Sequence, residues 1–176
     1  MYYIENETDE KIDLKNVRAV LKKLVSYYGE KRDFSVTFVT DEEIRNLNRE
    51  YRNLDMPTDI LTFRLDDTPS FPISFDEEEM MVPDEEEMGD IFISLDTMRR
   101  NALEFGVKEE EELSRLLLHG LLHLRGLDHK TNDFDKEEML KEQESVLAKL
   151  SLKGYTIDIF FVFVVSFLDS YIRCID

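Results

Sequence analysis

The chain has 176 residues, of which 42% are hydrophobic and 11% aromatic, so it can bury a core in one folded domain and is not an intrinsically disordered sequence. Its lone cysteine, Cys174, excludes a disulfide within the chain, and the first residues lack a basic stretch followed by an apolar run; we therefore expect a reducing, cytoplasmic location. The net charge of −18 excludes a broadly basic surface for nucleic acid or membranes, although it leaves room for a small basic cleft.

The first 65 residues alternate between predicted strands and helices. Apolar residues recur at helical spacing between Asp13, a predicted N-cap, and Gly29, a predicted stop. Thr40 and Glu43 have the spacing of a capping box, which predicts a second helix that continues through Tyr51. Runs of β-branched and aromatic residues before and after these helices predict strands at residues 2–5, 34–39 and 59–65.

An acidic, proline-containing segment separates these elements from a helix-rich second half. Residues 66–88 read as a long solvated loop, because blocks of like charge repel one another. We then expect a strand at 89–95, a helix at 96–105 that Gly106 closes, and further helices at 108–124 and about 134–150. Strands interleaved with helices predict an α/β or α+β layer structure, in which helices pack on a small and at least partly parallel sheet.

The end of the chain departs from this pattern. Its uncharged apolar run, residues 159–168, has about half of the ~20 residues that a transmembrane helix needs, so we expect no membrane association. Two interpretations stay open for residues 155–176: a buried extra element, or a poorly ordered terminus. We accordingly expect a single domain over residues 1–154, followed by an atypical apolar tail.

All three histidines of the chain lie within residues 119–129, which read H-G-L-L-H-L-R-G-L-D-H. His119 and His123 are four residues apart on a predicted helix and therefore share one face. Gly126 can end that helix in a left-handed conformation, and His129 follows the turn. Three imidazoles are a typical ligand set for one Zn²⁺ ion whose fourth position stays open to water, so we predict a catalytic-type zinc site at this helix end.

Two alternatives concern the chemistry of this site. Asp128 can be read as a fourth ligand, although a role in orienting a ligand or accepting a proton fits it better. The histidine spacing also matches that of metzincin peptidases, which carry a glutamate directly after the first histidine as the general base. Gly120 occupies that position here, so a peptidase would lack its proton acceptor.

Three blocks of the sequence resemble those of one known family. Residues 119–129 resemble the signature of the YbeY family of bacterial endoribonucleases, residues 48–63 resemble its N-x-x-Y-R-x-x-D-x-P-T-D-V-L-S-F block, and residues 89–94 resemble its G-D-I-x-I-S strand. The blocks occur in the family's order, and the similarity extends over about residues 1–150. The resemblance implies an α+β fold with a small mixed four-stranded sheet and about five helices, and a YbeY-like catalytic domain over residues 1–154.

The resemblance also implies a function. It implies a single-strand-specific, zinc-dependent endoribonuclease that acts in 3′-end maturation of small-subunit ribosomal RNA and in ribosome quality control. The family's functional arginine falls on Arg52, which the residues alone would place as a solvated cation at a helix end. A guanidinium grips a phosphate through a planar fork, so we expect Arg52 to stabilise charge on the phosphate. We expect His119 to act as a catalytic zinc ligand and Asp128 to orient a ligand or move protons.

Two other functions remain alternatives at this point: a metzincin-like zinc peptidase, and a non-catalytic, zinc-binding ribosome assembly factor. The negative charge of the chain favours docking on a basic small-subunit ribosomal protein in either ribosomal role. Three features depart from the family's pattern. Arg64 follows L-T-F where proline is usual, the loop at 66–88 is longer and more acidic, and the tail at 155–176 has no counterpart.

Overall fold

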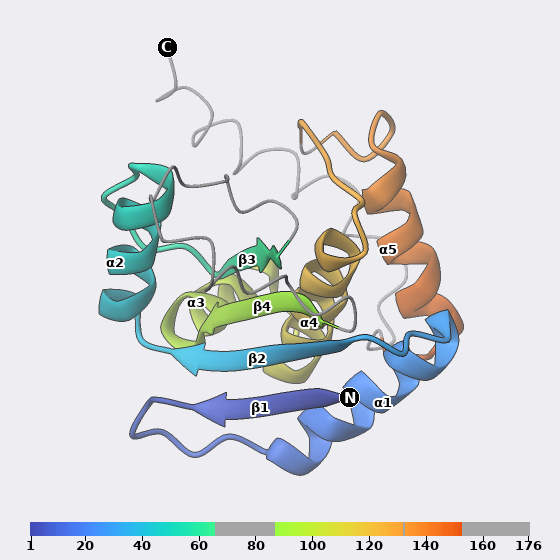
Figure 1. Cartoon of the computed structure of the whole chain (residues 1–176), viewed down its shortest axis with the longest axis horizontal. Coiled ribbons are helices and arrows are strands. Elements are labelled where there is room, and N and C mark those ends of the chain that lie inside the picture. Colours follow the sequence, from blue (N-terminus) through green and yellow to red (C-terminus); the bar gives the residue numbers. More distant parts are fainter. Residues whose placement is uncertain (66–86, 132, 153–176) are drawn as a thin grey trace, which may run out of the picture.

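The computed structural model describes residues 1–65, 87–131 and 133–152, which form a sheet covered by helices (Figure 1). In chain order the elements are β1 (Tyr2–Asn6), α1 (Leu14–Tyr28), β2 (Asp33–Val39), α2 (Asp41–Arg52), β3 (Ile60–Arg64), β4 (Glu87–Ser94), α3 (Leu95–Phe105), α4 (Glu109–Leu124) and α5 (Glu138–Lys149). Among the helices of these ranges, none combines the length and the apolar content that a membrane crossing requires. The predicted tail and most of the predicted acidic loop lie outside the described residues, and the domain boundary at 154 stays a prediction.

The strands lie in the order β1-β2-β4-β3, with β1 parallel to β2, β2 parallel to β4, and β3 antiparallel to β4. Parallel neighbours need a crossover connection, which α1 supplies between β1 and β2. The antiparallel pair runs from Ile60 opposite Ile93 to Arg64 opposite Gly89. Over the described residues, the predicted α+β fold with a mixed four-stranded sheet and five helices is therefore confirmed, and β3 forms one edge of the sheet.

Helix ends follow the predicted capping residues closely. The carboxylate of Asp13 accepts the first free N–H groups of α1, and Gly29 ends that helix in the left-handed conformation at φ 60°. Thr40 and Glu43 form the predicted capping box at the start of α2. The helix that ends in Arg52 therefore begins at a fixed point directly after β2.

Several predicted boundaries are wrong by one or a few residues, most clearly around β4 and at the start of α5. β4 begins at Glu87, inside the predicted loop, and Leu95 belongs to α3 because the hydroxyl of Ser94 caps that helix. The last helix begins at Glu138 rather than near Phe134. The carboxylate of Glu137 accepts N–H groups of the preceding loop, among them that of Thr131 at 2.8 Å, so the chain before Glu138 is held as turns.

Helices cover the two faces of the sheet unequally. On one face, among the described helices, only α2 packs, and its Ile44 joins Val39 and Leu61 in a small buried cluster. On the other face a larger cluster forms from the sheet and the remaining helices, which contribute Leu21 of α1, Met98 of α3, Leu117 of α4 and Leu147 of α5. Each fully buried leucine stabilises the fold by ~2 kcal/mol, so α4 is anchored mainly through this larger cluster.

Candidate metal centre

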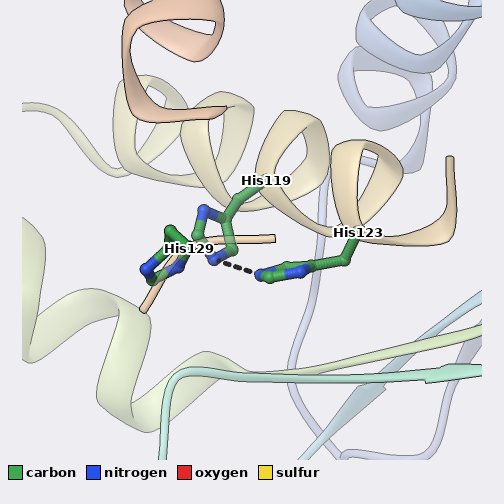
Figure 2. Close-up of side chains that lie close together, drawn as sticks. All are labelled: His119, His123 and His129. Atoms are coloured by element: carbon green, nitrogen blue, oxygen red, sulfur yellow. Dashed lines mark hydrogen bonds between the residues drawn. The ribbon is translucent and has the colours of Figure 1, made fainter. Parts of the chain in front are cut away.

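The three histidines come from α4 and from the turn that follows it (Figure 2). His119 and His123 lie one helical turn apart on α4, which ends at Leu124. Gly126 then adopts φ 88°, a left-handed conformation that favours glycine, and its N–H donates to the carbonyl of His123 at 2.8 Å. This predicted turn reverses the chain and returns His129 to the first two rings.

The three imidazole rings converge on one point, as Figure 2 shows. Their centroids lie 4.6, 5.2 and 5.4 Å apart, and one nitrogen of each ring lies within 4.8 Å of the other two. The Nε2 atoms of His119 and His123 are 3.1 Å apart. Two nitrogens bound to one tetrahedral zinc at ~2.05 Å would lie about 3.3 Å apart. His119, His123 and His129 could therefore hold one metal ion.

The outward-facing nitrogens of two rings have acceptors in the protein. Nδ1 of His119 lies 2.9 Å from Oε1 of Gln143, and Nδ1 of His129 lies 3.0 Å from the carbonyl oxygen of Thr131. Carbonyl oxygens only accept hydrogen bonds, so Nδ1 is the donor in both contacts and Nε2 keeps its lone pair for a metal. Partners of this kind fix the tautomer and the ring orientation of metal-binding histidines.

The surroundings also keep two of the rings uncharged. Desolvation lowers the pKa of His119, and the nearby charge of His129 lowers it further against an opposing hydrogen bond to Gln143. Desolvation and the two neighbouring histidines lower the pKa of His123 to about 4. Neutral imidazole is the form that binds a metal, so near neutral pH a cation would not have to displace protons from these rings.

The triad opens into a cleft of about 910 Å³. One side of this cleft is formed by α4, the following turn and α5, and the other side by the end of α2, β3 and α3. Arg52 is the last residue of α2, and its Nη2 donates to the carbonyl of Thr62 in β3 at 3.4 Å. The cleft thus brings together every site residue predicted from the sequence, namely Arg52, His119, His123, Asp128 and His129.

Comparison with known proteins assigns the chain to a family. The family model for endoribonuclease YbeY matches residues 3–151. The chain belongs to the YbeY family. An endoribonuclease YbeY from Nautilia profundicola is 35% identical over 152 residues, which cover 86% of this chain and 93% of the relative. One from Shouchella clausii is 42% identical over 125 residues, which cover 70% of this chain and 76% of the relative.

A solved structure shares the fold of this chain. The solution structure of TM1509 from Thermotoga maritima matches with a TM-score of 0.56 at 28% sequence identity. The match covers 85% of this chain and 89% of the other. The resemblance predicted from the three sequence blocks is therefore confirmed at the level of the family and of the fold.

The packing of α4 explains why this chain has glycine where metzincins have glutamate. A Cβ built on Gly120 would lie 2.8 Å from Cδ1 and 2.9 Å from Cγ2 of Ile91 in β4. Position 120 therefore faces the sheet, and a glutamate there would enter the hydrophobic core. The metzincin-like alternative is not favoured, because a general base cannot be placed in the cleft from this position.

Asp128 lies in the turn directly before His129. Its Oδ1 accepts the backbone N–H of His129 at 2.8 Å and lies 3.6 Å from Nδ1 of His123, while 81% of the side chain is exposed. The carboxylate thus holds the turn and lies beside the ring of His123, beyond hydrogen-bond distance. Its part in proton transfer stays a prediction.

Two polar groups of the cleft were missed in the sequence. Gln143 is buried in α5 against His119, between the apolar positions Met139 and Val146. Glu112 is buried on α4, where desolvation raises the pKa of its carboxyl to about 7 although Arg115 lies 2.9 Å away. Both could have been found in the sequence, because each is a polar residue at an apolar position of its helix. Glu112 in addition precedes His119 by two helical turns and therefore shares its helix face.

Proposed function

We propose that this chain is a zinc-dependent endoribonuclease that cleaves single-stranded RNA in the cleft beside the histidine triad. The observation that carries this proposal is the convergence of three imidazoles on one point of a cleft that Arg52 also lines. The relatives are named endoribonuclease YbeY, which supports the same reaction class. The physiological substrate that we propose is the 3′ end of small-subunit ribosomal RNA, with a further part in ribosome quality control.

Zinc is the metal that suits this ligand set best. Three neutral imidazole nitrogens without a thiolate are typical of catalytic zinc sites, which keep one position for water or substrate. Zinc bound here would supply a Lewis acid at the end of the cleft. Hard cations such as Mg²⁺ prefer oxygen ligands, and the triad offers none.

The side chains of the cleft would divide the work as follows. Arg52 grips a phosphoryl oxygen through its guanidinium fork and compensates the negative charge that grows during phosphodiester cleavage. Gln143 and the carbonyl of Thr131 hold the rings of His119 and His129 in the ligating orientation. Asp128 lies 3.6 Å from Nδ1 of His123 and is exposed in the cleft, where its proposed role is to move protons.

Cleavage of a labelled precursor of the ribosomal RNA 3′ end tests this function. We expect the zinc-loaded parent to cut the RNA at internal sites, and both His119→Ala and Arg52→Ala to lose the activity while circular dichroism shows a folded chain. The matched control is Arg18→Ala, which removes an exposed arginine of α1 outside the cleft and leaves cleavage unchanged. Equal cleavage by all four preparations would contradict the proposal and point to a contaminating nuclease.

The partner and the location that we propose follow from the same function. The net charge of −18 would draw the chain toward a basic small-subunit ribosomal protein, so we expect it in the cytoplasm in association with ribosomes. Co-sedimentation with ribosomes at rising salt tests this, because an electrostatic contact weakens with ionic strength. Co-sedimentation that persists in His119→Ala, together with no cleavage by the parent, would instead favour the non-catalytic assembly factor.

A further inference from the structure

Side chains of the edge strand β3 point alternately to its two faces, and one of the two sets lines the cleft. Successive residues of a strand point to opposite faces. Leu61 and Phe63 pack with the α2 cluster on one face, whereas Ile60, Thr62 and Arg64 line the cleft on the other. Arg64 is therefore directed toward the histidine side of the sheet by its register, and its side chain is half-buried there.

The guanidinium of Arg64 lies against the turn that carries the third histidine. A Cβ built on Gly126 would lie 3.7 Å from both terminal nitrogens of Arg64 and 3.8 Å from its Cζ. Gly126 is the reversing residue midway between His123 and His129. Arg64 therefore spans the cleft from the strand side to the metal side, and its charge sits next to the metal centre.

The end of β3 is held in place by an unusually close strand contact. Arg64 pairs with Gly89 of β4, where φ is 135° and an added Cβ would lie 2.0 Å from the carbonyl oxygen of Phe63. Only glycine permits this approach. The backbone that carries Arg64 is thus pinned to β4, which favours a fixed direction for its side chain over a freely moving surface cation.

Two arginines reach the cleft at successive points along the same strand. Arg52 from α2 donates to the carbonyl of Thr62. Arg64 lies two residues after Thr62, so the Cα atoms of Thr62 and Arg64 are about 6.6 Å apart along the strand. Arg100 and Arg115 also line the cleft, but they lie on α3 and α4 and not on β3.

We infer that Arg64 forms a second phosphate-binding site of the cleft, which takes the phosphate next to the one held by Arg52. The inference rests on the proposed function, since its ligand is a single-stranded polyanion that runs along β3. A planar guanidinium binds two phosphate oxygens at once, so Arg64 fixes the register of the strand relative to the metal centre. Arg64 is a substrate-binding residue here and takes no part in bond breaking.

Binding of a short fluorescent single-stranded RNA, 2′-O-methylated throughout, to the zinc-loaded protein measures this contact as a function of salt. Loss of one phosphate contact makes the slope of log Kobs against log salt shallower by ~0.7, which is about fivefold weaker binding at ~0.1 M salt. We expect this change for Arg64→Gln. We expect Arg64→Lys to retain the slope, because lysine keeps the charge, and to lose only part of the affinity.

The matched control is Arg18→Gln, which removes the same charge from outside the cleft. It should leave both the slope and the affinity as in the parent. An Arg64→Gln slope equal to that of the parent would overturn the inference. An equal change in Arg18→Gln would overturn it as well, because the effect would then belong to the net charge. In cleavage assays we expect Arg64→Gln to raise KM about fivefold with kcat unchanged.

A second arm needs no protein variant and therefore does not depend on how Arg64→Gln folds. Single methylphosphonate groups, which are uncharged, replace each phosphate of the RNA in turn. We expect weaker binding to the parent protein at two adjacent positions, one for Arg52 and one for Arg64. A single sensitive position would overturn the second site while leaving the proposed function intact. A parent that neither binds nor cleaves RNA would overturn the proposed function and this site together.

Discussion

The two sides of the cleft have opposite physical character. In the metal wall, formed by α4, its following turn and α5, two of the three histidines are uncharged: burial lowers the pKa of His119 and His123, and Gln143 is buried behind His119. The phosphate wall, formed by the end of α2 and by β3, carries Arg52, which is exposed, and Arg64, which is half-buried. The metal wall therefore holds its side chains in a fixed geometry, whereas the phosphate wall supplies positive charge.

This division follows from what desolvation costs. A neutral imidazole loses little on burial once its second nitrogen has an acceptor, so metal ligands can be fixed in a packed helix. A buried guanidinium needs a carboxylate partner that compensates its charge, as Glu112 does for Arg115, whereas the exposed Arg52 keeps its charge solvated. We therefore expect changes in the metal wall to alter metal affinity, and changes in the phosphate wall to alter substrate binding or stability alone.

The largest effect is expected where the phosphate wall is joined to the rest of the sheet. Gly89→Ala would place a Cβ 2.0 Å from the carbonyl oxygen of Phe63, so β3 must move away from β4. We expect a loss of about 4 kcal/mol in the free energy of unfolding, measured by urea denaturation.

Gly106→Ala is the matched control for this change. It shares the left-handed backbone, at φ 66°, but has no atom within 4 Å of the added Cβ. It should lose only ~1 kcal/mol. Equal losses in the two variants would mean that the close approach of β3 to β4 contributes nothing beyond backbone conformation.

The next effect is a pH dependence set in the metal wall by Glu112. Burial raises its carboxyl pKa to about 7, so between pH 4.5 and 7 the folded chain binds more protons than the unfolded chain. This contribution lowers stability as pH rises, by about 3 kcal/mol across the window. The lowered pKa of His123, about 4, has the opposite sign and raises stability between pH 4 and 6.5.

Replacing Glu112 by glutamine separates these opposing contributions. In the metal-free chain, we expect the stability of Glu112→Gln to rise with pH more steeply than that of the parent, because the opposing contribution of Glu112 is removed. Urea unfolding at intervals between pH 4.5 and 7 measures the difference. Parallel curves for the parent and the variant would show that Glu112 titrates as an ordinary carboxyl.

A smaller effect is expected from the residue behind the first ligand. Gln143→Leu removes the acceptor for Nδ1 of His119, which lies 2.9 Å away. Loss of such a partner weakens metal binding by about 10- to 100-fold. Competition with a zinc chelator measures the change, and Gln143→Glu, which keeps an acceptor oxygen, is the matched control that should lose less. Unchanged affinity in Gln143→Leu would mean that α4 alone orients the ring.

The smallest effect tests whether the phosphate wall is independent of the metal wall. Thr40→Ala removes the side-chain cap of α2, the helix that ends in Arg52, and should cost ~1 kcal/mol in stability. Thr40→Ser keeps the cap and serves as the control. We expect zinc affinity to be unchanged in both variants. A weaker zinc site in Thr40→Ala would show that the two walls are mechanically coupled.

Those parts of the fold that depend on local chemistry could be predicted from the sequence. The cap at Asp13, the capping box of Thr40 and Glu43, and the reversal at Gly126 were all predicted and are present. Each depends on residues a few positions apart, so one sequence contains the whole signal. The strand order could not be predicted in this way, because β2 pairs with β4 across a long separation in the chain.

In the candidate site, too, the features that depend on nearby residues could be predicted and those that depend on long-range packing could not. The spacing of His119, His123 and His129 within one helix and one turn was enough to predict that the three rings lie together. The partner of His119, Gln143, lies 24 residues further along, and its role depends on how α5 packs against α4. Arg64 stood out in the sequence only as a departure from the family pattern, and its place in the cleft depends on the pairing of β3 with β4.

The hydrogen-bond acceptors of His119 and His129 also differ in how easily a substitution removes them. His119 depends on the side chain of Gln143, which a change of one codon can delete. His129 donates instead to the main-chain carbonyl of Thr131, and every amino acid at that position supplies the same oxygen. A single substitution at position 143 can therefore remove the hydrogen bond that orients His119. The hydrogen bond that orients His129 persists as long as the backbone conformation at Thr131 is unchanged.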